Sequence, residues 1–182
     1  MFFLTIFLQG LLLGFSIAAP VGPIGVLCIR RTLGGGRLTG FLSGLGAATA
    51  DMFFGAIAAF GLTALTDILV GQKLWLGLIG GLFLVYLGIK TFLTKPADTA
   101  ASAKGTGLLG AYLSTLALTL TNPMTILAFT GMFVGMQFNL SGGGVFSAAT
   151  LVLGVFLGSA AWWLTLSWLV GLLREKFTTA WM

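Results

Sequence analysis

Residues 38–66 read LTGFLSGLGAATADMFFGAIAAFGLTALT, and Asp51 is the single charged side chain in this run. A helix of about 20 apolar residues is long enough to cross the hydrocarbon core of a bilayer. Uncharged residues extend from Leu38 to Ala50 before the acid and from Met52 to Thr66 after it. The run therefore predicts a transmembrane helix with one acidic residue near the middle of the membrane.

The rest of the chain has the same apolar character. Of 182 residues, 58% are hydrophobic and 7% are charged, whereas charged residues make up about 25% of an average soluble domain. No charged residue occurs before Arg30 or between Lys104 and Arg174. We therefore predict an all-α, polytopic transmembrane bundle, because helices satisfy their own backbone hydrogen bonds in lipid and no segment alternates like a barrel strand.

Charged residues, prolines and glycine clusters divide the chain into five predicted spans. They form a single transmembrane domain, residues 1–182, with spans at about 4–29, 38–65, 72–93, 108–136 and 144–173. Short polar connectors join them, the first from Arg30 to Arg37. The uncharged stretch between Lys104 and Arg174 also has room for three shorter spans in place of the last two.

The basic residues set the predicted orientation. With five spans, eight of the nine Lys and Arg residues lie on one side of the membrane and only Lys73 lies on the other. Because cytoplasmic loops carry an excess of Lys and Arg, we expect a multi-pass protein with its N-terminus outside. A third span after Lys104 would move Arg174 and Lys176 to the outside, so two long spans are favoured. The first span lacks the basic n-region of a signal peptide, and we expect it to be retained.

The composition excludes several kinds of chemistry. The net charge is +5, but the basic residues are grouped at the ends of apolar segments, so we expect contacts with anionic lipid headgroups and no nucleic acid. There is no histidine, and Cys28 is the single cysteine, so we predict no disulfide within the chain, no metal site and no cofactor. No nucleophile, base and orienting group occur together, so an enzyme is not expected.

Asp51 is the first candidate functional residue. An aspartate so deep in a span costs about 2.5–3.5 kcal/mol on insertion scales and usually faces the bundle interior or a water-filled path. Burial there favours the neutral acid, which suits the uptake and release of a proton. We therefore predict that Asp51 binds a proton or the substrate. The structural alternative is an N-cap, or a hydrogen bond to a broken neighbouring helix.

Two proline breaks provide further candidates. Pro20, Gly22 and Pro23 interrupt the first span, and Asn122-Pro123 interrupts the fourth. Proline lacks the N–H that would bond the carbonyl four residues earlier, so freed carbonyls and half-helix N-termini can bind the ammonium and carboxylate of a zwitterion. A kink that only shapes packing is the alternative. The predicted substrate- and proton-binding residues are Asp51, Pro20, Gly22, Pro23, Asn122 and Pro123.

Other side chains in the later spans are candidates for the lining of a cavity. Thr119 belongs to a cluster of threonines around Asn122, although threonine also bonds back within helices. Trp162 and Trp163 lie in the middle of a span and not at the membrane interface. Glycines four residues apart predict faces of close helix packing. These pairs include Gly10 with Gly14 and Gly154 with Gly158.

The two interrupted spans indicate internal symmetry. Each opens one half of the chain, and each is followed by a glycine-rich span. Since they are the first and the fourth span, the halves would be inverted in the membrane, as in many secondary transporters. We therefore predict an inverted three-plus-three repeat whose sixth helix is absent from this chain.

In these features the chain resembles the LysE/RhtB family of bacterial amino-acid exporters. The residues that carry the resemblance are Gly14-Phe15, Pro20-Val21-Gly22-Pro23, Arg30-Arg31, Gly36-Arg37, Gly40-Phe41, Gly44 to Asp51, and Asn122-Pro123. The resemblance covers nearly all of the chain and implies six spans, a location in the bacterial cytoplasmic (inner) membrane, and proton-driven export of amino acids. It also marks the two proline breaks and Asp51 as pathway residues. Many members carry a lysine after the Asn-Pro pair, where this chain has Met124.

The sequence thus predicts a secondary transporter that exports amino acids or similar small zwitterions by proton antiport. Its predicted partners are a small-molecule substrate, protons and membrane lipids, and a homo-oligomer is compatible with the sequence. Two alternatives stay open. An inorganic-cation exporter would use the oxygens of Asp51, Asn122 and freed carbonyls as hard ligands. A non-transporting membrane subunit would keep its helices for packing only.

Overall fold

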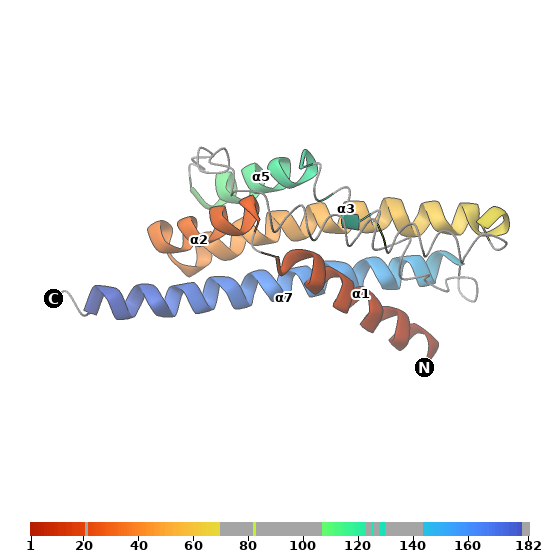
Figure 1. Cartoon of the computed structure of the whole chain (residues 1–182), viewed down its shortest axis with the longest axis horizontal. Coiled ribbons are helices and arrows are strands. Elements are labelled where there is room, and N and C mark those ends of the chain that lie inside the picture. The colour runs from red at the N-terminus through yellow and green to blue at the C-terminus, as the bar shows by residue number, and fades with distance from the viewer. Residues whose placement is uncertain are drawn as a thin grey trace.

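The structure is a computed structural model of the chain, and it describes residues 1–20, 22–69, 82, 107–122, 125, 128–129 and 144–179, with side chains except at 61–69 and 174–179. Every element of regular structure in these residues is a helix, which confirms the all-α prediction. Pro123 and, apart from Leu82, the predicted span at 72–93 lie outside the described residues. The helices are α1 (Phe2–Ala18), α2 (Pro23–Gly35), α3 (Arg37–Leu69), α5 (Gly107–Leu120) and α7 (Gly144–Thr179) (Figure 1).

The long apolar helices have the length that a membrane span requires. Residues Arg37–Phe60 of α3 and Gly144–Leu173 of α7 can each cross a bilayer. The pair α1 and α2 passes the same test as one broken span, bent by 79°. The part of the chain that the structure describes therefore holds two or three candidate spans, together with the shorter apolar helix α5.

The break between α1 and α2 has the cause that the sequence predicts. α1 ends where the N–H of Ala19 donates to the carbonyl of Phe15 at 2.9 Å, and Pro20 cannot continue this pattern because it has no N–H. Gly22, in an extended conformation, is the N-cap of α2, and Pro23 occupies the first turn, where its missing N–H costs nothing.

The next boundary differs from the predicted connector, which ran from Arg30 to Arg37. In the structure α2 continues through Arg30 and Arg31 to Gly35. Gly36 alone separates α2 from α3, and its φ of 88° lies in the region that glycine enters without strain. The helix ends at the glycine cluster and not at the arginines, because arginine has a high helix propensity and glycine has a low one.

Helices α3 and α7 run antiparallel along a shared seam. Gly44 of α3 lies against the indole of Trp163, and Gly55 lies against the side chain of Val155. As α3 proceeds towards its C-terminus, its contacts on α7 therefore move towards the N-terminus of α7. This seam buries the middle of both helices.

Helix α1 crosses α7 at backbone distance (Figure 1). Four glycines, spaced four apart on each helix, make the crossing, and a Cβ on any of them would overlap a carbonyl oxygen of the other helix. They are Gly10 and Gly14 on α1, and Gly154 and Gly158 on α7. Small residues at this spacing allow close approach of helices, as their pattern predicts.

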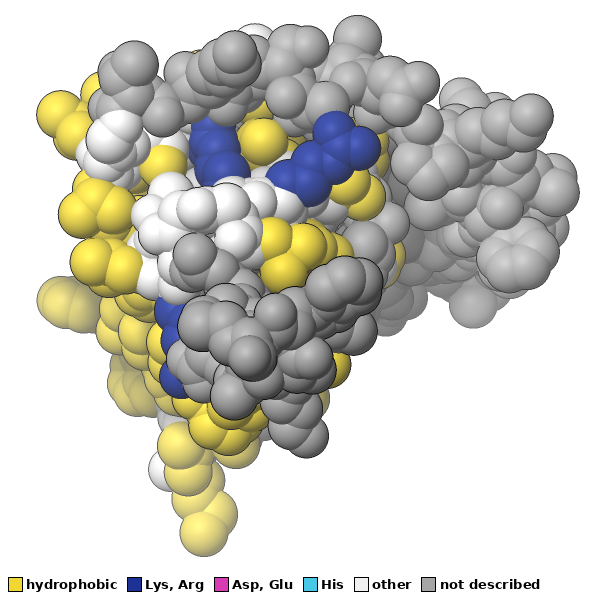
Figure 2. Space-filling model, turned by 90° about the vertical axis from the view of Figure 1, so that its left-hand side faces the viewer, with side chains coloured by type: hydrophobic (Ala, Val, Ile, Leu, Met, Phe, Trp, Pro, Cys, Tyr) yellow, Lys and Arg dark blue, Asp and Glu magenta, His cyan; other side chains and the backbone are white. Residues whose placement is uncertain are grey.

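The arginines with described side chains gather at one end of the bundle. Figure 2 shows dark-blue side chains on the face at the left of Figure 1, where α2 ends and α3 begins. They are Arg30, Arg31 and Arg37, of which Arg30 is exposed and the other two are partly buried.

Candidate functional site

Asp51 lies in the middle of α3 and is 3% exposed. Its Oδ2 accepts a hydrogen bond from the hydroxyl of Ser159 on α7 at 2.6 Å. The position within the helix excludes the N-cap interpretation of this acid. A bond between helices does occur, but its donor belongs to the continuous helix α7 and not to the broken first span.

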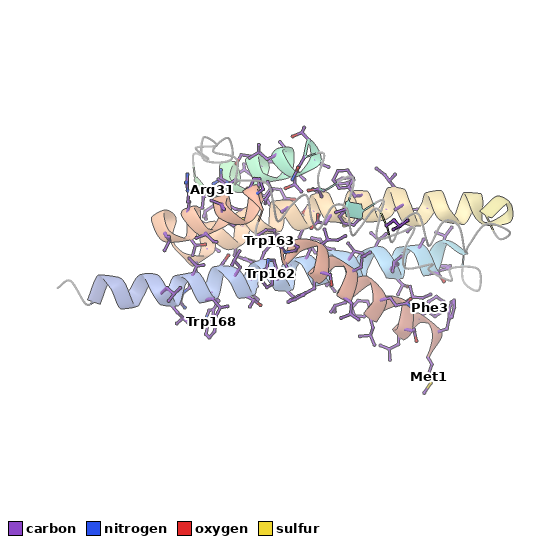
Figure 3. All side chains as sticks on the ribbon, viewed as in Figure 1. Met1, Phe3, Arg31, Trp162, Trp163 and Trp168 are labelled. Carbon is purple, nitrogen blue, oxygen red and sulfur yellow. The ribbon has the colours of Figure 1, made fainter. Side chains whose placement is uncertain are left out.

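A tryptophan completes the chain of hydrogen bonds at this acid. The indole Nε1–H of Trp163 donates to Oγ of Ser159 at 3.1 Å. Trp163 lies between α7 and α3 (Figure 3), and its ring is against Gly44, which has no side chain to exclude it. One buried line of hydrogen bonds therefore crosses the α3–α7 seam, from Trp163 through Ser159 to Asp51, and we call it the polar line.

Trp162 points to a different helix. Its ring meets that of Phe15 on α1 edge to face, with centroids 5.3 Å apart, and it is partly buried. Trp162 also packs against the buried cluster that contains Trp163, but of the two tryptophans only Trp163 donates a hydrogen bond to Ser159.

An apolar cluster brings the helix break close to this line. Ala18 at the end of α1 and Ile24 at the start of α2 pack in one cluster with Ala47, Ala48 and Trp163. Ala47 precedes Asp51 by four residues and so lies one turn away on the same face. The backbone around the break is therefore next to the helix turn that carries the acid.

The residues of the first break have different exposures. Pro20 and Pro23 are exposed, whereas Gly22 is partly buried. No side chain caps the N-terminus of α2, and the first N–H groups of a helix have no acceptor within it. The backbone at this end of α2, rather than the proline rings, is the part that can bind an anionic group.

The second predicted break is visible at the end of α5. The helix ends at Leu120, and the N–H of Asn122 donates to the carbonyl of Thr119 at 3.1 Å while its own carbonyl accepts from the N–H of Thr125. Asn122 is partly buried. Thr119 is buried and bonds back to the carbonyl of Thr115 at 2.8 Å, as threonine commonly does in helices.

Sequence reasoning did not include Arg31 among the candidate site residues, although the residue counted as a topological charge and as part of the family resemblance. Its Nη1 donates to the carbonyl of Ala111 and the hydroxyl of Thr115 at 2.8 Å each, and to Ser43 at 3.1 Å. Its Nη2 donates to the hydroxyl of Ser114 at 2.8 Å. One guanidinium therefore joins α2 to both α3 and α5.

A helical pattern could have identified Arg31. Leu27 and Cys28, three and four residues earlier, are buried on the inner face of α2. Residues at these spacings share a helix face, so extending the helix through the arginines places Arg31 inside and Arg30 outside. The predicted connector began at Arg30, so the helical spacing from Leu27 and Cys28 to Arg31 was not considered.

The arrangement offers two polar centres in the described part of the bundle. The acidic centre is Asp51 with Ser159, and the basic centre is Arg31 with its hydroxyl and carbonyl acceptors. Ser43 and Asp51 are eight residues apart on α3, which is about 12 Å along the axis at 1.5 Å per residue. One α-ammonium and α-carboxylate pair cannot reach both centres at once.

Comparison with known proteins places these features among membrane translocators. A model of the LysE type translocator family matches residues 15–182. A Bacillus subtilis (strain 168) protein named "Putative amino acid efflux protein YcgF" is 30% identical over 182 aligned residues, which cover 95% of this chain and 86% of that protein. No solved structure matches the chain.

Proposed function

This chain belongs to the LysE type translocator family, and from that premise we propose that it exports amino acids or similar small zwitterions across the bacterial inner membrane in exchange for protons. The name of the Bacillus subtilis relative supports the amino-acid class of substrate. The buried Asp51 supports proton coupling, because an ionisable residue inside a membrane bundle usually belongs to an ion or proton pathway. This acid is the observation on which the proposal rests.

In the proposed cycle, the Asp51 carboxyl holds a proton in one facing state and the substrate ammonium in the other. The proton and the substrate ammonium then compete for the same carboxyl oxygens, so that binding of one requires release of the other. The described partner of the carboxyl is a single hydroxyl, Ser159, which leaves one carboxyl oxygen for an incoming donor. Competition at one acid is the simplest way to couple two opposite fluxes.

We assign the substrate carboxylate to the N-terminus of α2. Its uncapped backbone N–H groups and the positive end of the helix dipole favour an anion. Ile24, in the first turn of α2, packs in the cluster that includes Ala47, one turn from Asp51. The proposed site thus includes Gly22 and the flanking Pro20 and Pro23 as backbone elements, with Asn122 and Pro123 on the opposite half of the repeat.

We also propose the orientation and surroundings of the protein. The end of the bundle that carries Arg30, Arg31 and Arg37 faces the cytoplasm, where basic residues are enriched and anionic headgroups attract them. The N-terminus then lies outside. The inverted three-plus-three repeat would relate the break after α1 to the break after α5, and a homo-oligomer is compatible with this arrangement.

Reconstitution tests the proposal. Proteoliposomes loaded with a panel of radiolabelled amino acids should release at least one of them when a pH gradient is imposed. Asp51→Asn should reduce this release to the background of empty vesicles, because the amide cannot lose a proton. Asp98→Asn is the control, since the sequence places that acid in a polar connector.

The outcomes separate the proposal from its rivals. Gradient-driven release by Asp51→Asn at the normal rate would refute the role of the acid. Release of no amino acid, together with protection of cells from toxic cations, would indicate a cation exporter. Among the described residues, no three or more His, Cys, Asp or Glu side chains are grouped so that they could hold a metal ion. A hard cation such as Ca²⁺ takes about 6–8 oxygen ligands.

A further inference from the structure

We propose that Ser159 is the positioning residue for proton exchange at Asp51, and that the indole of Trp163 orients the Ser159 hydroxyl. This inference rests on the proposed proton coupling and adds two residues to it. Neither the comparisons nor the sequence assigns a role to Ser159. Its evidence is a line of hydrogen bonds that is entirely buried, since Ser159 is 0% exposed and Trp163 is 4% exposed.

When Asp51 is ionised, the hydrogen bonds along this line can run in one direction only, from Trp163 through Ser159 to the carboxylate. An indole N–H can only donate, so Trp163 occupies a lone pair of the Ser159 oxygen at 3.1 Å. The single hydroxyl proton of Ser159 is then directed to the carboxylate at 2.6 Å. A hydrogen bond to an ionised acceptor is shorter and stronger than a neutral one, so this arrangement stabilises the carboxylate.

The same line also accommodates the protonated acid. When Asp51 is neutral, its C=O oxygen still accepts the Ser159 hydroxyl, now as a hydrogen bond to an uncharged and weaker acceptor, and the indole of Trp163 still donates to Ser159. Ser159 therefore bonds to Asp51 in both states without moving its backbone. Alanine at this position would bond to neither form.

No other described residue takes the place of Ser159. Among the residues that the structure describes, Ser159 is the hydrogen-bond partner of Asp51. α1 has no ionisable side chain, and neither has α7 from Gly144 to Leu173. The ionisable side chains on the remaining helices around Asp51 are Cys28, Arg30 and Arg31 on α2, Arg37 and Asp67 on α3, and Tyr112 on α5.

The described groups among these have other surroundings. Arg31 bonds to Ser43 and to α5, and the hydroxyl of Tyr112 donates to Thr49 at 2.9 Å. Cys28 packs in the apolar cluster with Ala47 and Ala48. Among the described residues, the hydroxyl of Ser159 is therefore the hydrogen-bonding group that can set the proton affinity of Asp51.

Infrared titration of the reconstituted protein tests this assignment directly. The chain has four Asp and Glu residues, so the C=O stretch of the protonated Asp51 carboxyl can be assigned by its loss in Asp51→Asn. Ser159→Ala should move the titration midpoint of that band, and the pH of half-maximal efflux, upward by about one to two units, since it removes a charge-assisted hydrogen bond. Ser159→Cys, a weak donor of similar size, should give a smaller upward shift.

Two matched controls separate this effect from packing. Ser167 lies on the same face of α7, and its buried hydroxyl has no hydrogen-bond partner among the described residues, so Ser167→Ala should leave the band unshifted. Trp163→Phe should shift the midpoint upward by less than Ser159→Ala. Trp162→Phe should not shift it, because Trp162 contacts Phe15 and the neighbouring apolar cluster but makes no described hydrogen bond to Ser159 or Asp51.

The outcomes distinguish this inference from the proposed function. Titration curves of Ser159→Ala and Ser159→Cys that coincide with the unaltered protein would overturn the inference, even when Asp51→Asn abolishes coupled efflux. Coupled efflux by Asp51→Asn would instead refute the proposed function. If Ser159→Ala does not insert, the conservative Ser159→Cys variant decides the question.

Discussion

The guanidinium of Arg31 lies 2.8 Å from the hydroxyl of Thr115, a contact that joins the second half of the broken first span to helix α5. The same side chain reaches Ser43 on α3 and the carbonyl of Ala111. Three helices from both halves of the chain therefore meet at one cation near the arginine-rich end of the bundle. A planar fork of fixed donors suits such a junction better than a flexible ammonium group.

We expect Arg31→Lys to lower the stability of the protein although it keeps the charge. Lysine has one nitrogen where Arg31 uses two, so it cannot keep the bonds of both Nη1 and Nη2, and the loss of charged hydrogen bonds should cost about 2 kcal/mol. Thermal unfolding in detergent should show a midpoint lower by about 5 °C. Arg30→Lys is the control, because Arg30 is exposed. An equal change in both variants would show that the hydrogen bonds of Arg31 do not add to the stability of the bundle.

The crossing of α1 and α7 should tolerate no added methyl group. At Gly14 a Cβ would overlap the carbonyl oxygen of Val155, which belongs to the backbone and cannot turn away. We expect Gly14→Ala to destabilise the bundle by about 1–3 kcal/mol. Gly55→Ala is a matched control, since its Cβ would lie 3.4 Å from the side chain of the same Val155, an ordinary contact. Unfolding curves that change equally in the two variants would contradict the close packing of α1 against α7 at Gly14.

The sequence predicts the helices of this fold better than it predicts their contacts. A long apolar run and a proline can be identified locally, so α3, α7 and the break at Pro20 were expected. The end of α2 was misplaced because charges were taken as the limit of the span, whereas Gly36 is the residue that ends the helix. Helix propensity, not polarity, decided this boundary.

The candidate site shows the same division between local and long-range information. Asp51 is recognisable because an acid in an apolar run is costly wherever it lies. Ser159 is one of several small polar residues in α7, and its partner is 108 positions earlier in the chain. Pairing at such a separation depends on how α3 and α7 are aligned, which no local pattern specifies.

The single cysteine provides a test of the inner packing. Cys28 is 0% exposed and packs against Ala47 and Trp163, so we expect a maleimide to leave it unmodified in the folded protein and to label it fully after denaturation. Mass spectrometry of the labelled chain measures this. Arg30→Cys in a Cys28→Ser background should react readily, because position 30 is exposed. Rapid labelling of Cys28 in the native bundle would show that α2 does not pack as described.

Packing at Gly44 is connected to the proton site through Trp163. Trp163 can reach Ser159 because Gly44 leaves room for its ring, and a Cβ at Gly44 would overlap Cβ and Cγ of the tryptophan, the part of the side chain least able to move. Gly44→Ala should therefore displace the indole and weaken its hydrogen bond to Ser159.

We expect Gly44→Ala to raise the pH of half-maximal efflux in the same direction as Trp163→Phe, while Gly55→Ala on the same helix leaves it unchanged. The double variant Gly44→Ala with Trp163→Phe should shift no further than Trp163→Phe alone, because both changes remove the same hydrogen bond, and residues that act through one contact are not additive. Additive shifts in this cycle would mean that Gly44 affects Asp51 by a route that does not include the indole.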